Sequence, residues 1–161
     1  MKIIYKFLNS SDILYNKQDL VEMVIKTLKE NITQNFPETI AQEYVEKMPG
    51  YIEDGSAIIV GAFHKEQLIG FLLGYEVDIF GEKRIHTTEI HVKEEYRRYG
   101  IAKKMLGWLE IEAIRRNIYI LEAMCTVSNQ DAYRYHINNG YEIERIKFKK
   151  SLNKNDIKEA F

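Results

Sequence analysis

Residues 92–106 read VKEEYRRYGIAKKML and carry the most informative pattern in this chain of 161 residues. An apolar run that ends at Val92 passes through a short charged turn into a helix that begins near Gly100. The first turn of a helix has backbone N–H groups without a partner in the helix, and the positive end of the helix dipole lies there. Because glycine has no Cβ, an anion can approach this backbone closely. The pattern therefore predicts a strand-loop-helix unit that holds phosphate groups.

Basic side chains surround this helix start and would add to its attraction for an anion. They belong to Arg97, Arg98, Lys103 and Lys104. The alternative is an ordinary turn between a strand and a helix, because two better-known phosphate loops, GxxxxGK[ST] and GxGxxG, do not occur in the chain.

A second pattern lies downstream, where residues 129–141 read NQDAYRYHINNGY after a strand-like apolar run at 119–127. Together the two patterns resemble the GNAT superfamily of acyl-CoA-dependent N-acetyltransferases. Its motifs are [Arg/Gln]-x-x-Gly-x-[Gly/Ala] and Asn-x-x-Ala-x-x-x-Tyr-x-x-x-Gly-[Phe/Tyr]. The matching residues are Arg97, Gly100 and Ala102 in the first motif and Asn129, Ala132, Gly140 and Tyr141 in the second.

The resemblance implies that acetyl-CoA lies between two splayed parallel strands. Its pyrophosphate would meet the backbone N–H groups of residues 97–103, its pantetheine arm would bond the backbone of residues 90–92 and Asn129, and its thioester would lie near His136. The residues expected to bind the cofactor are Ile90, His91, Val92, Arg97, Arg98, Tyr99, Gly100, Ile101, Ala102, Lys103, Asn129 and His136.

The implied reaction is the direct attack of a primary amine on the thioester. In the family a Tyr protonates the leaving thiolate, but His136 fills that position here, with Tyr135 beside it. A histidine can donate a proton near neutral pH, so His136 is the first candidate for the acid. Tyr135 and Tyr133 are the alternatives.

Glu89 is the first candidate for the base that takes a proton from the amine, and His86 is the second. Strict alternation along a strand places Thr87, Glu89 and His91 on one face. Family members often have a bulge in this strand, which would break that alternation. In the alternative interpretations these side chains are polar groups on a solvated face, or water alone deprotonates the amine.

Length and periodicity predict one mixed α/β domain over residues 1–161. Antiparallel strands come first, a parallel strand-helix-strand pair follows, and helices cover both faces of a GNAT-like central mixed sheet. Strands are expected at 1–8, 57–63, 68–75, 83–92, 119–127 and 141–152, and helices at 19–28, from Pro37 to Pro49-Gly50, at 100–116 and at 131–138.

Composition restricts the class of protein. Hydrophobic residues make up 45% and charged residues 29%, as in an ordinary soluble domain. We expect no membrane association, because no apolar stretch is long enough to span a bilayer and the N-terminus is too short and charged for a signal peptide. Cys125, the single cysteine, is expected to be a buried structural thiol in a strand. A cytoplasmic location fits this cysteine usage.

Charge is unevenly distributed along the chain. Residues 1–92 carry a net charge of −5 and residues 93–161 a net charge of +4. The basic half suits an anionic cofactor and the acidic half suits an amine acceptor, although chance gives such imbalances too. Neither a metal nor a nucleic acid is expected, because histidine and cysteine lack ligand spacing and no nucleic-acid motif accompanies the sequence pI of about 6.4.

Two other classes of protein compete with an enzyme. One is a non-catalytic acyl-CoA-binding module, in which His136 in place of Tyr marks lost chemistry. The other is a structural α/β domain. Residues 141–152 leave little room for the family's two closing strands, so one strand is missing or is supplied by another subunit of a homodimer. Because those strands often line the acceptor site, the sequence does not identify the acceptor.

Overall fold

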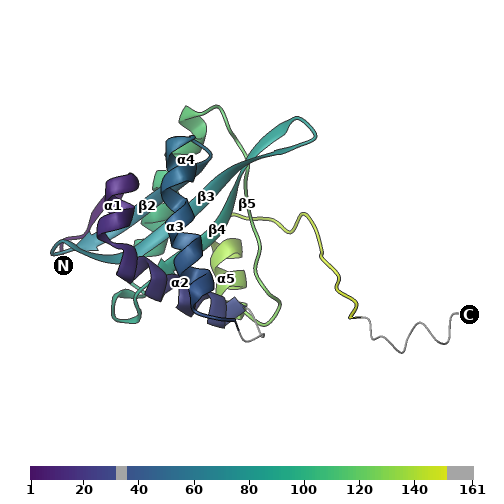
Figure 1. The fold of residues 1–161 in the computed structure, drawn as a ribbon. Helices are drawn as coiled ribbons and strands as arrows, with labels where there is room; N and C mark the ends of the chain where they lie inside the picture. Colours follow the sequence, from purple (N-terminus) through teal and green to yellow (C-terminus); the bar gives the residue numbers. More distant parts are fainter. Residues whose placement is uncertain (32–35, 152–161) are drawn as a thin grey trace, which may run out of the picture.

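The computed structural model describes residues 1–31 and 36–151 and arranges them around a five-stranded mixed sheet (Figure 1). The strands lie in chain order and pair antiparallel, except for the last two, which are parallel. They are β1 (Ile4–Phe7), β2 (Ala57–His64), β3 (Gln67–Ile79), β4 (Glu82–Val92) and β5 (Leu121–Ala123). This arrangement confirms the predicted fold class.

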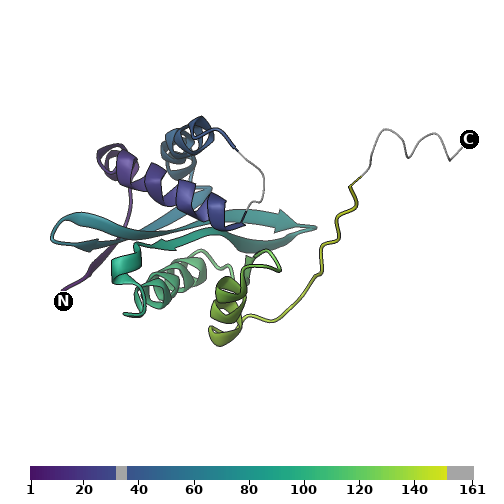
Figure 2. The same cartoon turned by 90° about the horizontal axis from the view of Figure 1, so that it is seen from below.

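Helices cover both faces of the sheet (Figure 2). The three helices that precede β2 lie on one face, and the two helices that follow β4 lie on the other. They are α1 (Ser10–Tyr15), α2 (Lys17–Asn31), α3 (Thr39–Glu53), α4 (Ile101–Arg115) and α5 (Gln130–Asn138), with a single 3-10 turn, η1 (Glu94–Tyr96), before α4. Within residues 1–31 and 36–151, no helix is both long and apolar enough to cross a membrane.

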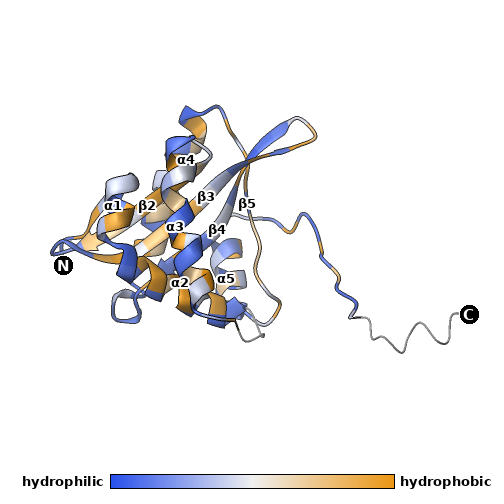
Figure 3. Cartoon of the chain, in the orientation of Figure 1, coloured by the Kyte–Doolittle hydropathy of each residue, from blue (hydrophilic) through white to orange (hydrophobic). Residues whose placement is uncertain are grey.

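The central strands are apolar on both sides because helices bury both faces. β2 reads AIIVGAFH, an apolar sequence (Figure 3), and its first seven residues are buried. Its side chains alternate between two cores: Ile59 packs with α1, α2 and α3, and Ile58 packs with α4. The same division continues on β3, so the sheet separates the two helical layers.

Helix α3 continues past the predicted end at Pro49-Gly50 and finishes at Glu53. A proline inside a helix removes one backbone hydrogen bond and costs about 3 kcal/mol. Burial offsets that cost here, because Val45 and Met48 are fully buried against the sheet just before the proline. The prediction that the pair ends the helix was therefore wrong.

Three further predictions fail at the outer edge of the sheet. β5 has three residues rather than the expected 119–127, and residues 141–151 form no strand, while Leu152 lies outside the described residues. Cys125 is exposed rather than buried in a strand. The common cause is that β5 has β4 as its neighbour on one side and no described strand on the other. Apolar residues beyond Ala123 therefore have no second strand to pack beside.

Candidate active site

A bulge in β4 decides which way the candidate catalytic side chains point. Leu73 of β3 pairs with Glu89, but the next residue, Gly74, pairs with Thr87, so β4 has one extra residue, Thr88. An extra residue reverses the alternation of side chains along the strand. The prediction that Thr87 and Glu89 share a face was therefore wrong.

The two faces of β4 have different neighbours on either side of this bulge. Thr87 follows Ile85, which packs in the core beneath α4, and its hydroxyl interacts with Tyr141. Glu89 and His91 instead turn to the opposite face, where both approach Thr27 of α2. Glu89 and His91 thus share a face as predicted, while Thr87 lies across the sheet from them.

β4 and β5 pair over three positions and then separate. The pairs are Ile85 with Leu121, His86 with Glu122 and Thr87 with Ala123. β4 continues to Val92, whereas the chain after Ala123 leaves the sheet to reach α5 (Figure 1). The backbone of residues 88–92 therefore has no strand partner on the β5 side, at the carboxyl ends of two parallel strands, which is where ligands of open α/β sheets bind. We call this place, where the two strands diverge, the opening.

The start of α4 lies at the same end of β4 and offers backbone donors. Gly100 caps the helix with a left-handed backbone, φ 74°, and no side chain accepts from the first turn. Lys104 is the first residue to bond back, to the Gly100 carbonyl at 3.1 Å. The space that a Cβ of Gly100 would enter is open, with no atom within 4 Å. Glycine thus permits this conformation and leaves the approach to the N–H groups clear.

The basic residues around this helix start have two different roles. Arg97 positions the loop, because its Nε donates to the Val92 carbonyl at 3.0 Å and its guanidinium pairs with Glu30 at 3.3 Å. Arg98 has a left-handed backbone, φ 68°, and is exposed together with Lys103. In the described part of the chain neither of these two forms an ion pair, so their charge faces the solvent around the helix start.

Glu89 is a buried carboxyl, 9% exposed, and its Oε2 has no hydrogen-bond partner within the described residues. Burial raises the pKa of the Glu89 carboxyl to about 7. A carboxyl of this kind is about half ionised at neutral pH. It can therefore accept a proton from a substrate and return it to water.

His91 beside it stays neutral, because burial and then the charges of Arg97, Lys26 and Lys93 lower its pKa to about 4. Its Nδ1 lies 3.1 Å from the Thr27 hydroxyl. That hydroxyl donates its single proton to the Met23 carbonyl, so we assign the proton between the two side chains to His91 Nδ1. Nε2 is then an acceptor, and it is buried without a partner in the described structure.

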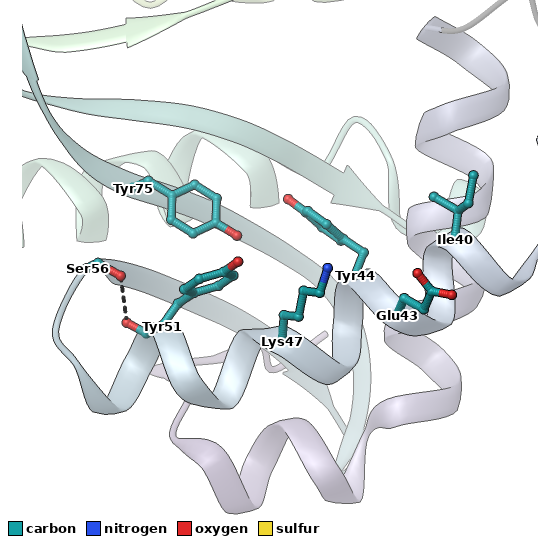
Figure 4. Close-up of a pocket in the computed structure, with 7 residues that line it drawn as sticks. All are labelled: Ile40, Glu43, Tyr44, Lys47, Tyr51, Ser56 and Tyr75. Carbon is teal, nitrogen blue, oxygen red and sulfur yellow. Dashed lines mark hydrogen bonds between the residues drawn. The ribbon is translucent and has the colours of Figure 1, made fainter.

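A cleft of about 510 Å³ opens on the same face of the sheet as Glu89, between α3 and β3 (Figure 4). The hydroxyls of Tyr44 and Tyr75 point toward each other in this cleft. Burial raises the pKa of both phenols, and the negative charge of Glu89 adds to that rise. The Tyr44 hydroxyl is buried without a partner in the described structure. Nothing in the sequence patterns connected Tyr44 with Glu89.

Helix α5 is tied to both helical layers. Asn129 caps it, with Oδ1 accepting from the Ala132 N–H at 3.0 Å and Nδ2 donating to Asn31 Oδ1 at 2.9 Å. Tyr135 reaches the start of α4, where its hydroxyl donates to the Ala102 carbonyl at 3.1 Å. These contacts hold α5 across the opening from β4.

His136 lies half-buried on α5, and burial lowers its pKa, so the ring is neutral near pH 7. Its Nδ1 is buried without a partner in the described structure. The ring lies 5.4 Å from that of Tyr135 and 5.0 Å from that of Tyr141, measured between centroids. The structure therefore brings His136 and Tyr135 together on α5 and places Glu89 on the other side of β4.

His86, the second candidate base, belongs to a charged cluster at the paired end of β4. Its Nδ1 lies 2.9 Å from Glu122, which Arg84 also approaches at 3.3 Å. Arg84 binds Glu144 through both terminal nitrogens, at 2.7 and 2.8 Å. Among residues 1–31 and 36–151, no group of three or more His, Cys, Asp or Glu side chains is placed to hold a metal ion.

Comparison with known proteins agrees with this arrangement. Residues 25–141 match the sequence profile of the acetyltransferase (GNAT) family. The chain therefore belongs to the GNAT acetyltransferase family, which confirms the resemblance of the two motifs.

Solved structures share the fold. A predicted acetyltransferase from Clostridium acetobutylicum, determined with acetyl-CoA, is 18% identical, with a TM-score of 0.73 over 93% of this chain and 96% of that chain. A ribosomal-protein-alanine N-acetyltransferase from Brucella melitensis is 15% identical, with a TM-score of 0.71 over 94% and 100%. An aminoglycoside acetyltransferase from an uncultured soil sample is 13% identical, with a TM-score of 0.71 over 94% and 97%.

Proposed function

We propose that this protein is an N-acetyltransferase that moves the acetyl group of acetyl-CoA to a primary amine, with residues 1–161 as one catalytic domain. Family membership supports acetyl transfer in general. The observation that carries the finer proposal is the opening between β4 and β5, which has the free helix start of α4 at one end and a buried carboxyl on its wall.

The unpaired backbone of β4 and the helix start of α4 offer hydrogen-bond donors and positive charge to an acyl-CoA. The pyrophosphate would bind the N–H groups of residues 101–103, where Gly100 leaves the space clear, and Arg98 and Lys103 would add charge. The pantetheine arm would follow residues 90–92, whose side toward β5 has no strand partner in the described structure. Asn129 would border the arm from the start of α5, and Arg97 would hold the loop in place.

Glu89 would prepare the acceptor for attack. An amine of the lysine type has a pKa near ~10.4 and is almost fully protonated at neutral pH, so it must lose a proton first. The raised pKa of Glu89 suits it to take that proton. We place the acceptor on the α2 and α3 side of β4, where the cleft beside Tyr44 opens. A backbone N–H of β4 beside the bulge at Thr88, at the inner end of the opening, would stabilise the carbonyl oxygen as it gains charge.

The leaving sulfur would lie on the other side of β4, beside α5. His136 occupies the family's Tyr position there, while the Tyr135 hydroxyl is occupied by the Ala102 carbonyl. We therefore give Tyr135 a positioning role and keep His136 next to the sulfur. We place the enzyme in the cytoplasm, because the exposed free thiol of Cys125 suits a reducing compartment.

The test combines binding with turnover. Calorimetry with acetyl-CoA measures cofactor binding, and release of free thiol in the presence of a panel of amines and peptides measures transfer. We expect saturable binding and transfer to at least one amine class. Binding without transfer to any amine would favour an acyl-CoA-binding module. The absence of binding would refute both the acetyltransferase and the acyl-CoA-binding module.

A further inference from the structure

We propose that the hydroxyl of Tyr141 donates the hydrogen bond that stabilises the sulfur leaving CoA, the role that the family's motif gives to a Tyr at the position of His136. This inference rests on the proposed acetyl transfer. It assigns this role to the aromatic residue at the end of the second motif, and not to the motif's usual Tyr position.

The end of α5 places Tyr141 next to His136. Gly140 has a left-handed backbone, φ 87°, and its N–H bonds the Ile137 carbonyl at 3.1 Å. The N–H of Tyr141 bonds the His136 carbonyl, also at 3.1 Å. This pair of bonds is a Schellman motif, which folds the chain back over the last turn of the helix. The Tyr141 ring consequently packs edge-on against His136, at 5.0 Å and 68°.

The Tyr141 hydroxyl is buried and has no hydrogen-bond partner among the described residues. Most buried hydroxyls are hydrogen-bonded, because a buried hydroxyl without a partner is destabilising. Two other buried groups in this region also have no hydrogen-bond partner among the described residues: the Thr87 hydroxyl, which lies near the Tyr141 hydroxyl, and Nδ1 of His136. A bound group that accepts and donates hydrogen bonds would satisfy all three.

The position of Thr87 connects this cluster with the cofactor. Thr87 is the last residue of β4 that pairs with β5, so its side chain marks the point where the opening begins. Tyr141 therefore reaches the inner end of the opening, across from the helix start that we assign to the pyrophosphate. In an acyl-CoA, the thioester lies at the end of the pantetheine arm farthest from the pyrophosphate.

The other tyrosines of α5 do not have a free buried hydroxyl. Tyr135 donates to the Ala102 carbonyl at 3.1 Å, so its hydroxyl is already used in packing. Tyr133 is 42% exposed. Tyr141 is thus the phenol near His136 that is both buried and available.

The chemical step needs no other reactant. The protonated amine gives one proton to Glu89, its nitrogen bonds the thioester carbon, and the C–S bond breaks with its electron pair on sulfur. Burial raises the pKa of Tyr141, so its phenol stays protonated and donates a hydrogen bond to this thiolate. The second amine proton leaves as the adduct collapses. One proton finally reaches the thiol through water, and the other passes to solvent.

Tyr141→Phe tests the proposal, because it removes the hydroxyl and keeps the ring that packs against His136. We expect kcat to fall at least tenfold, with the acetyl-CoA dissociation constant within twofold of wild type and the melting temperature little changed. Tyr119→Phe, which deletes a hydroxyl on the exposed surface, is the matched control and should keep the wild-type kcat.

Two further readouts separate chemistry from packing. Acetyl thioesters of thiols with graded acidity should show a smaller deficit for Tyr141→Phe as the leaving thiol becomes more acidic. Adding His136→Tyr to Tyr141→Phe restores a phenol at the family's position and should raise kcat at least fivefold above that of Tyr141→Phe. This recovery is expected even if Tyr141→Phe is less stable than the wild type.

Tyr141→Phe with at least half of the wild-type kcat would overturn the proposal, and so would a deficit that is equal for all thioesters and is not rescued. Either result would leave acetyl transfer by the wild-type protein in place. A wild-type protein that transfers no acetyl group would overturn both.

Discussion

Replacing Glu89 with Gln should make the protein more stable and less active. The substitution keeps the size of a side chain that is 9% exposed and removes its ability to ionise. Because burial raises the pKa of Glu89 from 4.5 to about 7, the folded protein holds this proton more tightly than the unfolded chain does. Stability contributed by that proton is therefore present below pH 4.5 and is lost as pH rises to about 7.

The size of the effect follows from the shift. A difference of about 2.5 pKa units corresponds to about 3 kcal/mol at 1.36 kcal/mol per unit. Glu89→Gln should therefore match the wild-type free energy of unfolding near pH 4.5 and exceed it by up to about 3 kcal/mol at pH 8. Urea denaturation at pH 4.5, 6, 7 and 8 measures this divergence. Parallel curves for the two proteins would refute the reasoning.

Glu112→Gln is the matched control, because Glu112 is also a buried glutamate but has two cationic partners. Hydrogen bonds from Arg115 and then Arg116, working against desolvation, lower its pKa to about 2. Its ionised form stabilises the fold above pH 4.5, and that contribution is lost on acidification toward pH 2. Glu112→Gln should therefore destabilise the protein at pH 8, the opposite sign to Glu89→Gln.

Activity provides the other half of the test. If Glu89 takes the amine proton, wild-type kcat/KM should rise with pH through about 7 as the carboxyl ionises. Glu89→Gln should lower kcat/KM at least a hundredfold at pH 8 and remove that inflection. A variant that gains stability and keeps the inflection would show that water, and not Glu89, deprotonates the amine.

Three substitutions test the cofactor site. Gly100→Val should raise the acetyl-CoA dissociation constant at least tenfold in calorimetry while circular dichroism shows a folded protein, because a Cβ fills the open approach and strains the backbone at φ 74°; unchanged affinity would contradict the phosphate site. Arg98→Glu should weaken binding several-fold at 20 mM salt and far less at 0.5 M, since the Debye length is about 10 Å at 0.1 M; a salt-independent effect would argue against a phosphate contact. Asn129→Ala should weaken binding and lower the melting temperature, because the side chain caps α5 and bonds Asn31; an unchanged affinity would remove Asn129 from the cofactor site.

Sequence reasoning succeeded where local chemistry decides the structure. The helix start at Gly100 was predicted from one glycine after an apolar strand, because it depends on neighbours within a few residues. It failed where distant parts of the chain decide. The length of β5 depends on which strands flank it, and the continuation of α3 through Pro49 depends on burial against the sheet.

The bulge at Thr88 shows the same limit with the largest consequence for the site. The sequence of β4 carries no visible sign of the bulge, because the bulge depends on the pairing with β3. It nevertheless turns Glu89 away from Thr87. The groups that the fold leaves buried without a partner then fall into two sets on opposite sides of the strand. The set on the α2 and α3 side of the sheet contains Tyr44, Glu89 and His91. The set on the α5 side contains Thr87, His136 and Tyr141.

This division is consistent with the proposed acetyl transfer to an amine. The amine must lose a proton and the sulfur must be stabilised as it leaves, and a carboxylate beside the thiolate would oppose the second process by like-charge repulsion. A straight β4 would place Thr87 and Glu89 on one face, with both chemical tasks on one side of the thioester. The bulge places the strand between the two sets of polar groups. In the proposed reaction, one set can then act on the amine and the other on the leaving sulfur.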